Sequence, residues 1–354
     1  MDDSINDTNE NILNEYSLLK LGDKEFTKKF FLTNDISIRI FSNVQECLME
    51  DYFSVKSIGD SLKSSNYDIY IIDQEFNDID IRVKEICKNS SLRSKRITNG
   101  YYNMHHFGSP ACLYIDYEKK RVYILGTLKS CKKIFWSYVI KWILTQETLL
   151  KRIHLKGSLL QLGGKGYLII GGKSSGKSTL IYNLMKKNRN SKFISNTHVL
   201  IDKEGIAEGI KSNINFRKNM ALKICYENEK LRNKKILGCT NLDPIDLNYE
   251  ISDKCKVDTI VFYQYNCQNK YTRNGIQKSD MRNLIEMYSN AINVYSLKED
   301  LLDYRQFNIK KVCDDIKSQK ECLATIVEHT KNIGITCDCE NERCLENICD
   351  YFNY

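Results

Sequence analysis

Proline is almost absent from this sequence, with two residues among 354, and the 17 glycines are not gathered into any long segment. Proline-rich spacers and long glycine–serine linkers are therefore excluded. Hydrophobic residues make up 42% of the chain, which is enough for a core and unlike a wholly disordered protein. We expect two domains or one large two-lobed body from this length.

Long apolar runs are also absent: no stretch approaches the roughly 20 apolar residues that cross a bilayer. The nearest is IFWSYVIKWILTQETLL, residues 134–150, which Lys141 interrupts. We predict a core-facing helix there, with a membrane-surface helix as the alternative. The start, MDDSINDTNENILNEY, lacks the basic residues and apolar run of a secretory signal. We expect no membrane span and a cytoplasmic location.

Blocks of like charge are missing too. The formal net charge is +8, but lysine and arginine are scattered along the chain. A scattered excess indicates a solvated surface with a mild preference for anions. No zinc-finger, RNA-recognition or helix-turn-helix pattern is present, so the sequence gives no specific nucleic-acid signal.

Cysteine, by contrast, is abundant, with 14 residues. Without a secretory signal we expect reduced thiols, many buried as small hydrophobes. The segment CDCENERCLENIC has the spacing C-x-C-x4-C-x4-C, which differs from the paired C-x2-C of structural zinc sites. We place Cys337 and Cys339 on a strand and Cys344 and Cys349 on a helix. A metal site remains the alternative to hydrophobic packing.

Apolar periodicity predicts an α/β chain. Alternation predicts two hairpins, 111–116 with 121–126 and 156–162 with 166–171. Further strands are predicted at 37–41, 66–73, 192–195, 198–202, 206–210, 256–266 and 332–339. Helices are predicted near 44–51 and at 132–150, 178–187, 279–292, 298–307 and the C-terminus.

The second hairpin leads into GGKSSGKST, which fits the phosphate-loop pattern G-x-x-x-x-G-K-[ST]. The glycines allow backbone angles at which several N–H groups point at one anion, and a following helix adds its positive end. Lys177 is expected to reach the outer phosphates and Ser178 to ligate Mg2+. The predicted nucleotide-binding residues are Gly171, Gly172, Lys173, Ser174, Ser175, Gly176, Lys177, Ser178 and Thr179.

Two common phosphate-loop classes do not fit. GTP-binding switches need N-K-x-D, and NKYT at 269–272 lacks the aspartate. Transport ATPases need a signature loop before a strand ending in Asp-Glu, and none is found. HVLID ends in Asp202, as a Walker-B strand does, but DKEG then turns at once into another strand. Asp202 is therefore interpreted as a turn residue.

The run KGSLLQLGGKGYLIIGGKSSGKSTL, residues 156–180, resembles the core of the HPr kinase and phosphoenolpyruvate carboxykinase-like superfamily. In that superfamily a hairpin precedes the phosphate loop, and a short strand such as KFIS (192–195) follows its helix. The resemblance extends to its divergent, kinase-like branch, which includes small-molecule kinases and proteins associated with peptide tailoring.

The fold that this resemblance implies is α/β with a mixed sheet. It places a kinase-like P-loop nucleotide-binding domain at 111–354. The residues before it predict a small α/β lobe at 26–110 and a polar, flexible terminus at 1–25, with a helix from Asn11 as a further expectation.

The sequence departs from HPr kinases at the expected reaction centre. Lys156 stands where they have a histidine, and His154 lies two residues earlier. Asn196 and Thr197 replace the two aspartates that bind metal and deprotonate the acceptor. A placed base contributes about 100- to 10,000-fold to such reactions, so its loss would slow turnover without affecting ATP binding.

The candidate catalytic residues are Lys177, Asn196, Lys156 and Arg217. Lys156 is equally consistent with a strand-edge lysine, and Arg217 with a surface ion-pair partner. Substitutes for the missing base are Asp202, Glu204 and His198, each also consistent with a surface or turn residue.

Three functions follow from these residues. The first is an ATP- and Mg2+-dependent kinase acting on a hydroxyl of a peptide, protein or metabolite. The second is a nucleotide-binding accessory protein without turnover, which regulates or assists a partner enzyme. The third is binding of another phosphorylated ligand at the loop. The oligomeric state stays open.

Overall fold

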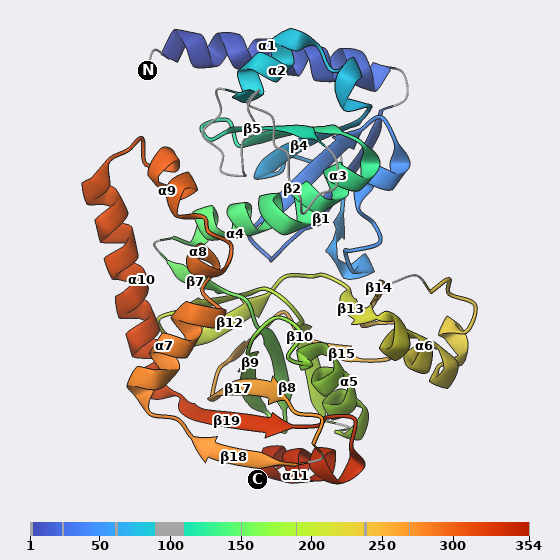
Figure 1. Ribbon diagram of the computed structural model, residues 1–354, viewed down its shortest axis with the longest axis vertical. Helices are drawn as coiled ribbons and strands as arrows, with labels where there is room; N and C mark the ends of the chain where they lie inside the picture. The colour runs from blue at the N-terminus through green and yellow to red at the C-terminus, as the bar shows by residue number, and fades with distance from the viewer. Residues whose placement is uncertain are drawn as a thin grey trace. The chain divides into compact units, whose positions relative to one another are not determined.

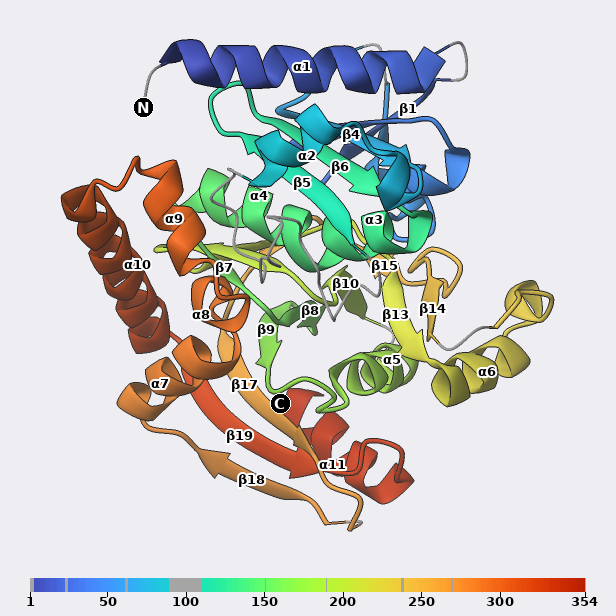
Figure 2. The same cartoon turned by 45° about the horizontal axis from the view of Figure 1, so that its top comes forward.

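The computed structural model describes residues 3–22, 25–60, 63–88, 110–149, 151–188, 190–236, 239–268 and 270–353. It is a mixed α/β protein (Figures 1 and 2) that divides into two compact units. Unit 1 comprises Met1–Glu50, Ser57–Gln146 and Leu297–Val312, and unit 2 comprises Asp51–Lys56, Glu147–Ser296 and Cys313–Tyr354. In the described residues, no helix is both long and apolar enough to cross a membrane.

Unit 1 is a six-stranded sheet with helices on both faces. The strand order is β3-β1-β2-β4-β6-β5, with β2, β4 and β6 parallel to one another. Its elements are α1 (Asp3–Leu21), β1 (Phe26–Phe31), β2 (Ser37–Ser42), β3 (Ile58–Gly59), β4 (Tyr67–Asp73), α2 (Ile81–Lys88), β5 (Ala111–Asp116), β6 (Arg121–Gly126), α3 (Leu128–Ile134), α4 (Ile140–Thr148) and α9 (Lys298–Tyr304).

The helices of unit 1 pack where apolar side chains alternate on the strands. Leu13 of α1 and Val83 of α2 are buried against Tyr70 and Ile72 of β4. Trp142 of α4 lies edge-on to Tyr67, whose position in β4 places it on the other face. The predicted helix at 132–150 is therefore a core helix, continued from α3 to α4 through a π-helical turn at Phe135–Val139.

Unit 2 is built on a seven-stranded mixed sheet in the order β15-β10-β8-β9-β17-β19-β18, with a four-stranded sheet β16-β12-β11-β7 and a ribbon β13-β14. Its strands are β7 (Arg152–Leu155), β8 (Ser158–Leu162), β9 (Lys165–Ile170), β10 (Ser191–Ser195), β11 (Val199–Asp202), β12 (Ile206–Gly209), β13 (Ile214–Arg217), β14 (Cys239–Leu242), β15 (Glu250–Ile251), β16 (Lys254–Lys256), β17 (Thr259–Tyr265), β18 (Thr272–Gly275) and β19 (Lys331–Cys337). Its helices are α5 (Lys177–Lys187), α6 (Lys218–Glu227), α7 (Lys278–Tyr288), α8 (Ala291–Val294), α10 (Ile309–His329, which begins in unit 1) and α11 (Glu342–Asn353).

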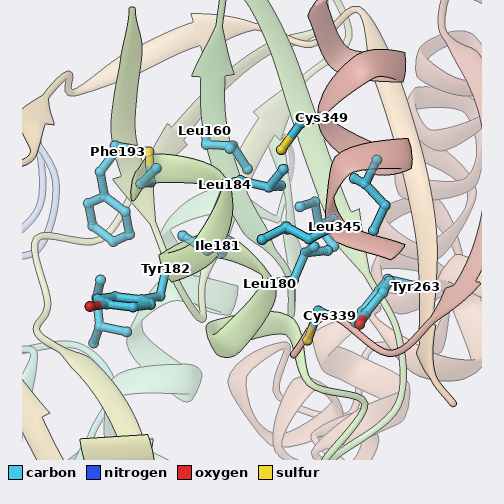
Figure 3. Packing of buried hydrophobic residues seen from close by; sticks show 14 of the residues in the cluster. Leu160, Leu180, Ile181, Tyr182, Leu184, Phe193, Tyr263, Cys339, Leu345 and Cys349 are labelled. Carbon is cyan, nitrogen blue, oxygen red and sulfur yellow. The ribbon is translucent and has the colours of Figure 1, made fainter. Parts of the chain in front are cut away.

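Each face of the seven-stranded sheet has its own core. On one face, α5, α6 and α11 pack against β8, β9, β17 and β19, as Figure 3 shows for part of this cluster. On the other face, α7, α10 and the four-stranded sheet contribute Met281, Leu323 and Val199. The parallel strands β9, β17 and β19 occupy the middle of this sandwich, so their ends define two opposite edges.

The boundaries of the two compact units differ from the domain boundaries expected from the sequence. The boundary expected at residue 110 lies at 146, because the hairpin β5–β6 joins the sheet of unit 1 through β4. The terminus expected to be flexible forms α1 from Asp3, so the helix expected from Asn11 is present and begins earlier, and its apolar stripe is buried. Of the lobe predicted at 26–110, residues 89–109 lie outside the described part.

A short segment, Asp51–Lys56, belongs to unit 2 rather than to the residues around it in the chain. The Ser54 hydroxyl and the Val55 amide donate to the carboxylate of Asp243 at 3.1 and 2.8 Å. The Asn213 amide donates to the carbonyl of Tyr52 at 2.7 Å. No motif marks this segment in the sequence.

Candidate functional site

The glycine loop lies between the end of β9 and the start of α5, as the motif predicts (Figure 2). Gly171 has φ +153°, and a Cβ there would lie 2.2 Å from the carbonyl oxygen of Tyr263. Gly176 caps α5 with φ +85°, and Ser174 also has positive φ. These angles turn the backbone tightly over the end of the sheet, at a helix N-terminus of the kind that attracts anions.

The helix behind the loop is held by its apolar face. Leu180, Ile181 and Leu184 of α5 are buried, and Figure 3 shows them within the cluster that also contains Leu160 and Phe193. A helix anchored along its length holds its first turn in a fixed place. The positive end of α5 therefore stays directed at the loop.

Lys177 folds back into the loop. Its Nζ donates hydrogen bonds to the carbonyl oxygens of Gly171 and Gly172 at 2.9 and 2.8 Å, and to the Ser175 hydroxyl at 3.1 Å. Burial, and next the positive charge of Lys156, lower the pKa of Lys177 to about 8. The hydrogen-bond partners of the ammonium are thus two carbonyls and one hydroxyl, all neutral. A bound anion would stabilise its positive charge more strongly.

Ser178, the predicted Mg2+ ligand, is paired with the residue that replaces the first aspartate. Its hydroxyl donates to Asn196 Oδ1 at 3.0 Å. Asn196 follows β10, is 4% exposed, and has its own carbonyl fixed by the Ser158 hydroxyl at 2.6 Å. A hydroxyl and an amide oxygen are both oxygen ligands of the type that Mg2+ accepts.

Two further predicted cations lie at the loop. The Arg217 guanidinium, at the end of β13, donates to the Ser174 hydroxyl. The Lys156 backbone amide donates to Ser289 O at 2.6 Å, and its Nζ lies 5.4 Å from the ring centroid of Tyr295. Burial, and next the charge of Lys173, lower the pKa of Lys156. Positive charge therefore concentrates around this loop.

The proposed substitutes for the missing base have other partners. His198 Nδ1 lies 2.9 Å from His154 Nε2; His154 is on β7, His198 directly precedes β11, and both side chains are buried. The Asp202 carboxylate accepts from the Ile206 amide at 2.8 Å, which confirms it as a turn residue. Glu204 pairs with Lys203 at the surface.

The four C-terminal cysteines pack as hydrophobic side chains. All four are buried in one cluster, and Figure 3 shows Cys339 and Cys349 within it. Cys337 ends β19, and Cys344 and Cys349 belong to α11, as predicted, but Cys339 lies just beyond the strand. Burial raises the pKa of Cys337 to about 12 and of Cys339 to about 11, so both stay neutral at ordinary pH. In the described part of the chain, no group of three His, Cys, Asp or Glu residues is arranged to hold a metal.

Two aromatic residues beside the loop were missed by the sequence analysis. A Cβ on Gly176 would lie 3.4 Å from Cβ of Tyr265, and one on Gly172 would lie 4.0 Å from Cδ1 of Tyr288. Tyr288 is 38% exposed, so its ring is accessible beside the loop. Tyr265 comes from β17 and Tyr288 from α7, about 90 to 115 positions after the loop residues they approach, and no local pattern connects them to the motif.

Comparisons with known proteins do not name a family. No protein-family model matches this chain, and no curated protein matches its sequence.

Proposed function

We propose that this protein binds a magnesium nucleoside triphosphate, with ATP as the expected nucleotide, and transfers its γ-phosphoryl group to a hydroxyl of a peptide, protein or small molecule. The observation that carries the proposal is the loop 171–176 between β9 and α5, with the Lys177 ammonium bonded inside it. Such a loop offers main-chain N–H groups and a helix N-terminus to a polyphosphate.

Lys177 stabilises the negative charge of the phosphoryl group during its transfer. Its hydrogen bonds to Gly171 and Gly172 are with neutral carbonyls, which phosphate oxygens would replace as stronger acceptors. Lys156, Lys173 and Arg217 add positive charge around the same loop. Phosphoryl transfer depends mainly on such positioning and charge stabilisation.

The residues present fit a magnesium ion. The Ser178 hydroxyl and the Asn196 amide oxygen would hold it, since they already lie 3.0 Å apart and Asn196 is fixed by Ser158. When bound, Mg2+ neutralises charge on the phosphates and orients them for transfer. Asn196 retains a ligand oxygen where a carboxylate would otherwise stand, but it cannot accept a proton as a base.

A second candidate function rests on that same substitution. With Asn196 and Thr197 in place of two carboxylates, the protein would bind nucleotide without turnover and assist a partner enzyme. The two functions share the nucleotide site and differ only in chemistry. The expected location, the cytoplasm, is the same for both.

The deciding experiment compares wild type with Lys177→Ala. Binding of Mg2+ with a non-hydrolysable ATP analogue is measured by calorimetry, and label transfer from γ-labelled ATP is measured into pooled peptides and pooled hydroxylated metabolites. The kinase proposal expects binding and label transfer in the wild type, and loss of both in Lys177→Ala. Binding without transfer, followed by weak transfer in Asn196→Asp/Thr197→Asp, would establish the accessory function. Absence of any nucleotide binding would overturn both.

A further inference from the structure

We propose a second ligand site at the opposite edge of the seven-stranded sheet, for a small organic dianion such as a phosphate monoester or a dicarboxylate. A cavity of about 750 Å³ lies there between the sheet and α11. Its floor is a row of residues in register across three parallel strands: Tyr167, Thr259 and Lys331. This volume is within the usual range of small-molecule sites, about 300 to 1,000 Å³.

The cavity is lined by more positive than negative charge. Lys165 at the start of β9, Arg273 on β18 and Lys331 at the start of β19 line it, against one carboxylate, Asp350 of α11. Within the described ranges, neither Arg273 nor Lys331 has a carboxylate at ion-pair distance. Two cations that line one cavity and have no ion-pair partner among the described carboxylates favour an anionic ligand.

Arg273 and Lys331 both make cation–π contacts with the ring of Tyr351. The Arg273 guanidinium carbon lies 4.6 Å from the ring centroid of Tyr351, and Lys331 Nζ lies 4.9 Å from it. The two charges are therefore less than about 10 Å apart, and cation–π contact limits how far each can move. The guanidinium fork fits the oxygens of a phosphate or carboxylate, and the ammonium adds a second donor.

A buried hydroxyl beside the cavity adds an independent observation. Tyr271 lines the cavity, and its hydroxyl oxygen is buried without a hydrogen-bond partner among the described residues. Burial raises the pKa of Tyr271, so the hydroxyl keeps its proton and can donate. Unsatisfied buried polar atoms are uncommon, so this hydroxyl keeps an unused capacity to donate a hydrogen bond to an anionic ligand.

The position separates this site from the glycine loop. β9 runs from Lys165 at the cavity to Ile170 before the loop, and six residue steps to Gly171 span about 20 Å. A ligand in the cavity is too far away to receive a phosphoryl group from the loop. The second site therefore stands on its own observations and does not depend on the proposed function.

The test measures binding of two dianions, glycerol 3-phosphate and succinate, by calorimetry and ligand-observed NMR, with acetate as a single-charge comparison. The wild type is expected to bind at least one dianion about tenfold or more tightly than acetate. Arg273→Ala/Lys331→Ala is expected to weaken that binding by about tenfold or more. Whether glycerol 3-phosphate or succinate binds more tightly identifies the phosphate or the dicarboxylate as the natural class.

Two matched variants complete the design. Arg343→Ala/Lys254→Ala removes the same two charges from exposed positions outside the cavity and should leave dianion binding unchanged. Tyr271→Phe keeps the ring and should weaken binding a few-fold, since only the hydroxyl is lost. Equal dianion affinity in wild type and Arg273→Ala/Lys331→Ala, or no binding of either probe at about 10 mM, would overturn the site. Binding of Mg-ATP to the same variants distinguishes this failure from failure of the glycine loop.

Discussion

The two edges of the seven-stranded sheet offer an anion different kinds of contact. At the carboxyl edge of β9, the contacts come from the main chain of a glycine loop, with the buried Lys177 inside it. At the amino edge, they come from side chains, Arg273 and Lys331, placed around the ring of Tyr351. The first edge depends on backbone angles, and the second depends on residue identity. Substitutions should therefore affect the two edges in different ways.

The largest effect is expected from a methyl group at the carboxyl edge. Gly171→Ala places a Cβ 2.2 Å from the Tyr263 carbonyl oxygen at φ +153°, so the backbone must shift. We expect a loss of about 3 kcal/mol in the free energy of unfolding, measured with urea. Gly163→Ala is the control, because its φ is +54° but the space around it is open; about 1 kcal/mol is expected. Equal losses in both would show that Tyr263 does not restrict the loop.

The next effect tests the single charge inside the loop. Lys177→Ala removes the ammonium and should weaken binding of Mg-ATP by about 100-fold, or about 2.7 kcal/mol. Lys173→Ala removes an exposed charge from the same loop and should cost about threefold or less. Binding of glycerol 3-phosphate at the amino edge should stay unchanged in Lys177→Ala, because the proposed sites at the two edges are independent. Similar losses from Lys173 and Lys177 would contradict the role given to Lys177.

A smaller effect is expected from a substitution that tests whether Asn196 helps to bind Mg2+. Asn196→Asp puts a carboxylate 3.0 Å from the Ser178 hydroxyl and should lower the Mg2+ concentration needed for nucleotide binding by about tenfold. Titration of Mg2+ at fixed nucleotide gives the value. Asn215→Asp adds the same charge on the exposed side of β13 and serves as the control. A Mg2+ requirement unchanged in Asn196→Asp would remove Asn196 from the metal site.

The smallest effect is a pH dependence. The pKa of Lys177 in the empty loop is about 8, and a bound polyphosphate should raise it, because the anion stabilises the charged form. Protons are therefore taken up on binding, and affinity should fall about fivefold as pH rises from about 7.5 to about 9. Calorimetry in buffers of different ionisation enthalpy measures both quantities. Lys177→Arg should flatten the profile, since arginine stays charged; an unchanged profile would assign the dependence to another group.

Local patterns predicted the loop and its surroundings well. The hairpins at β5–β6 and β8–β9, the helix α5 and the turn role of Asp202 are confirmed, because alternation, glycine spacing and turn residues act over a few positions. β1, α2, α6 and α10 were not predicted, and the helical stretch predicted near 44–51 is a short 3-10 helix at Gln45–Leu48. In α10, buried apolar residues concentrate near its C-terminal end, at Leu323, Ile326 and Val327, so its first turns give little helical pattern.

The amino acid sequence by itself determined the glycine loop, since its phosphate-binding geometry is built from consecutive residues whose backbone freedom is a local property. Tertiary structure alone decided what surrounds each edge of the sheet. Asn196 meets Ser178, and Arg273 and Lys331 meet Tyr351, only because strands distant in the chain pair in one register. It also decided that 111–146 belongs to unit 1, through pairing of β6 with β4. Such contacts depend on which distant strands become neighbours in the sheet, and the periodicity within one segment does not specify that.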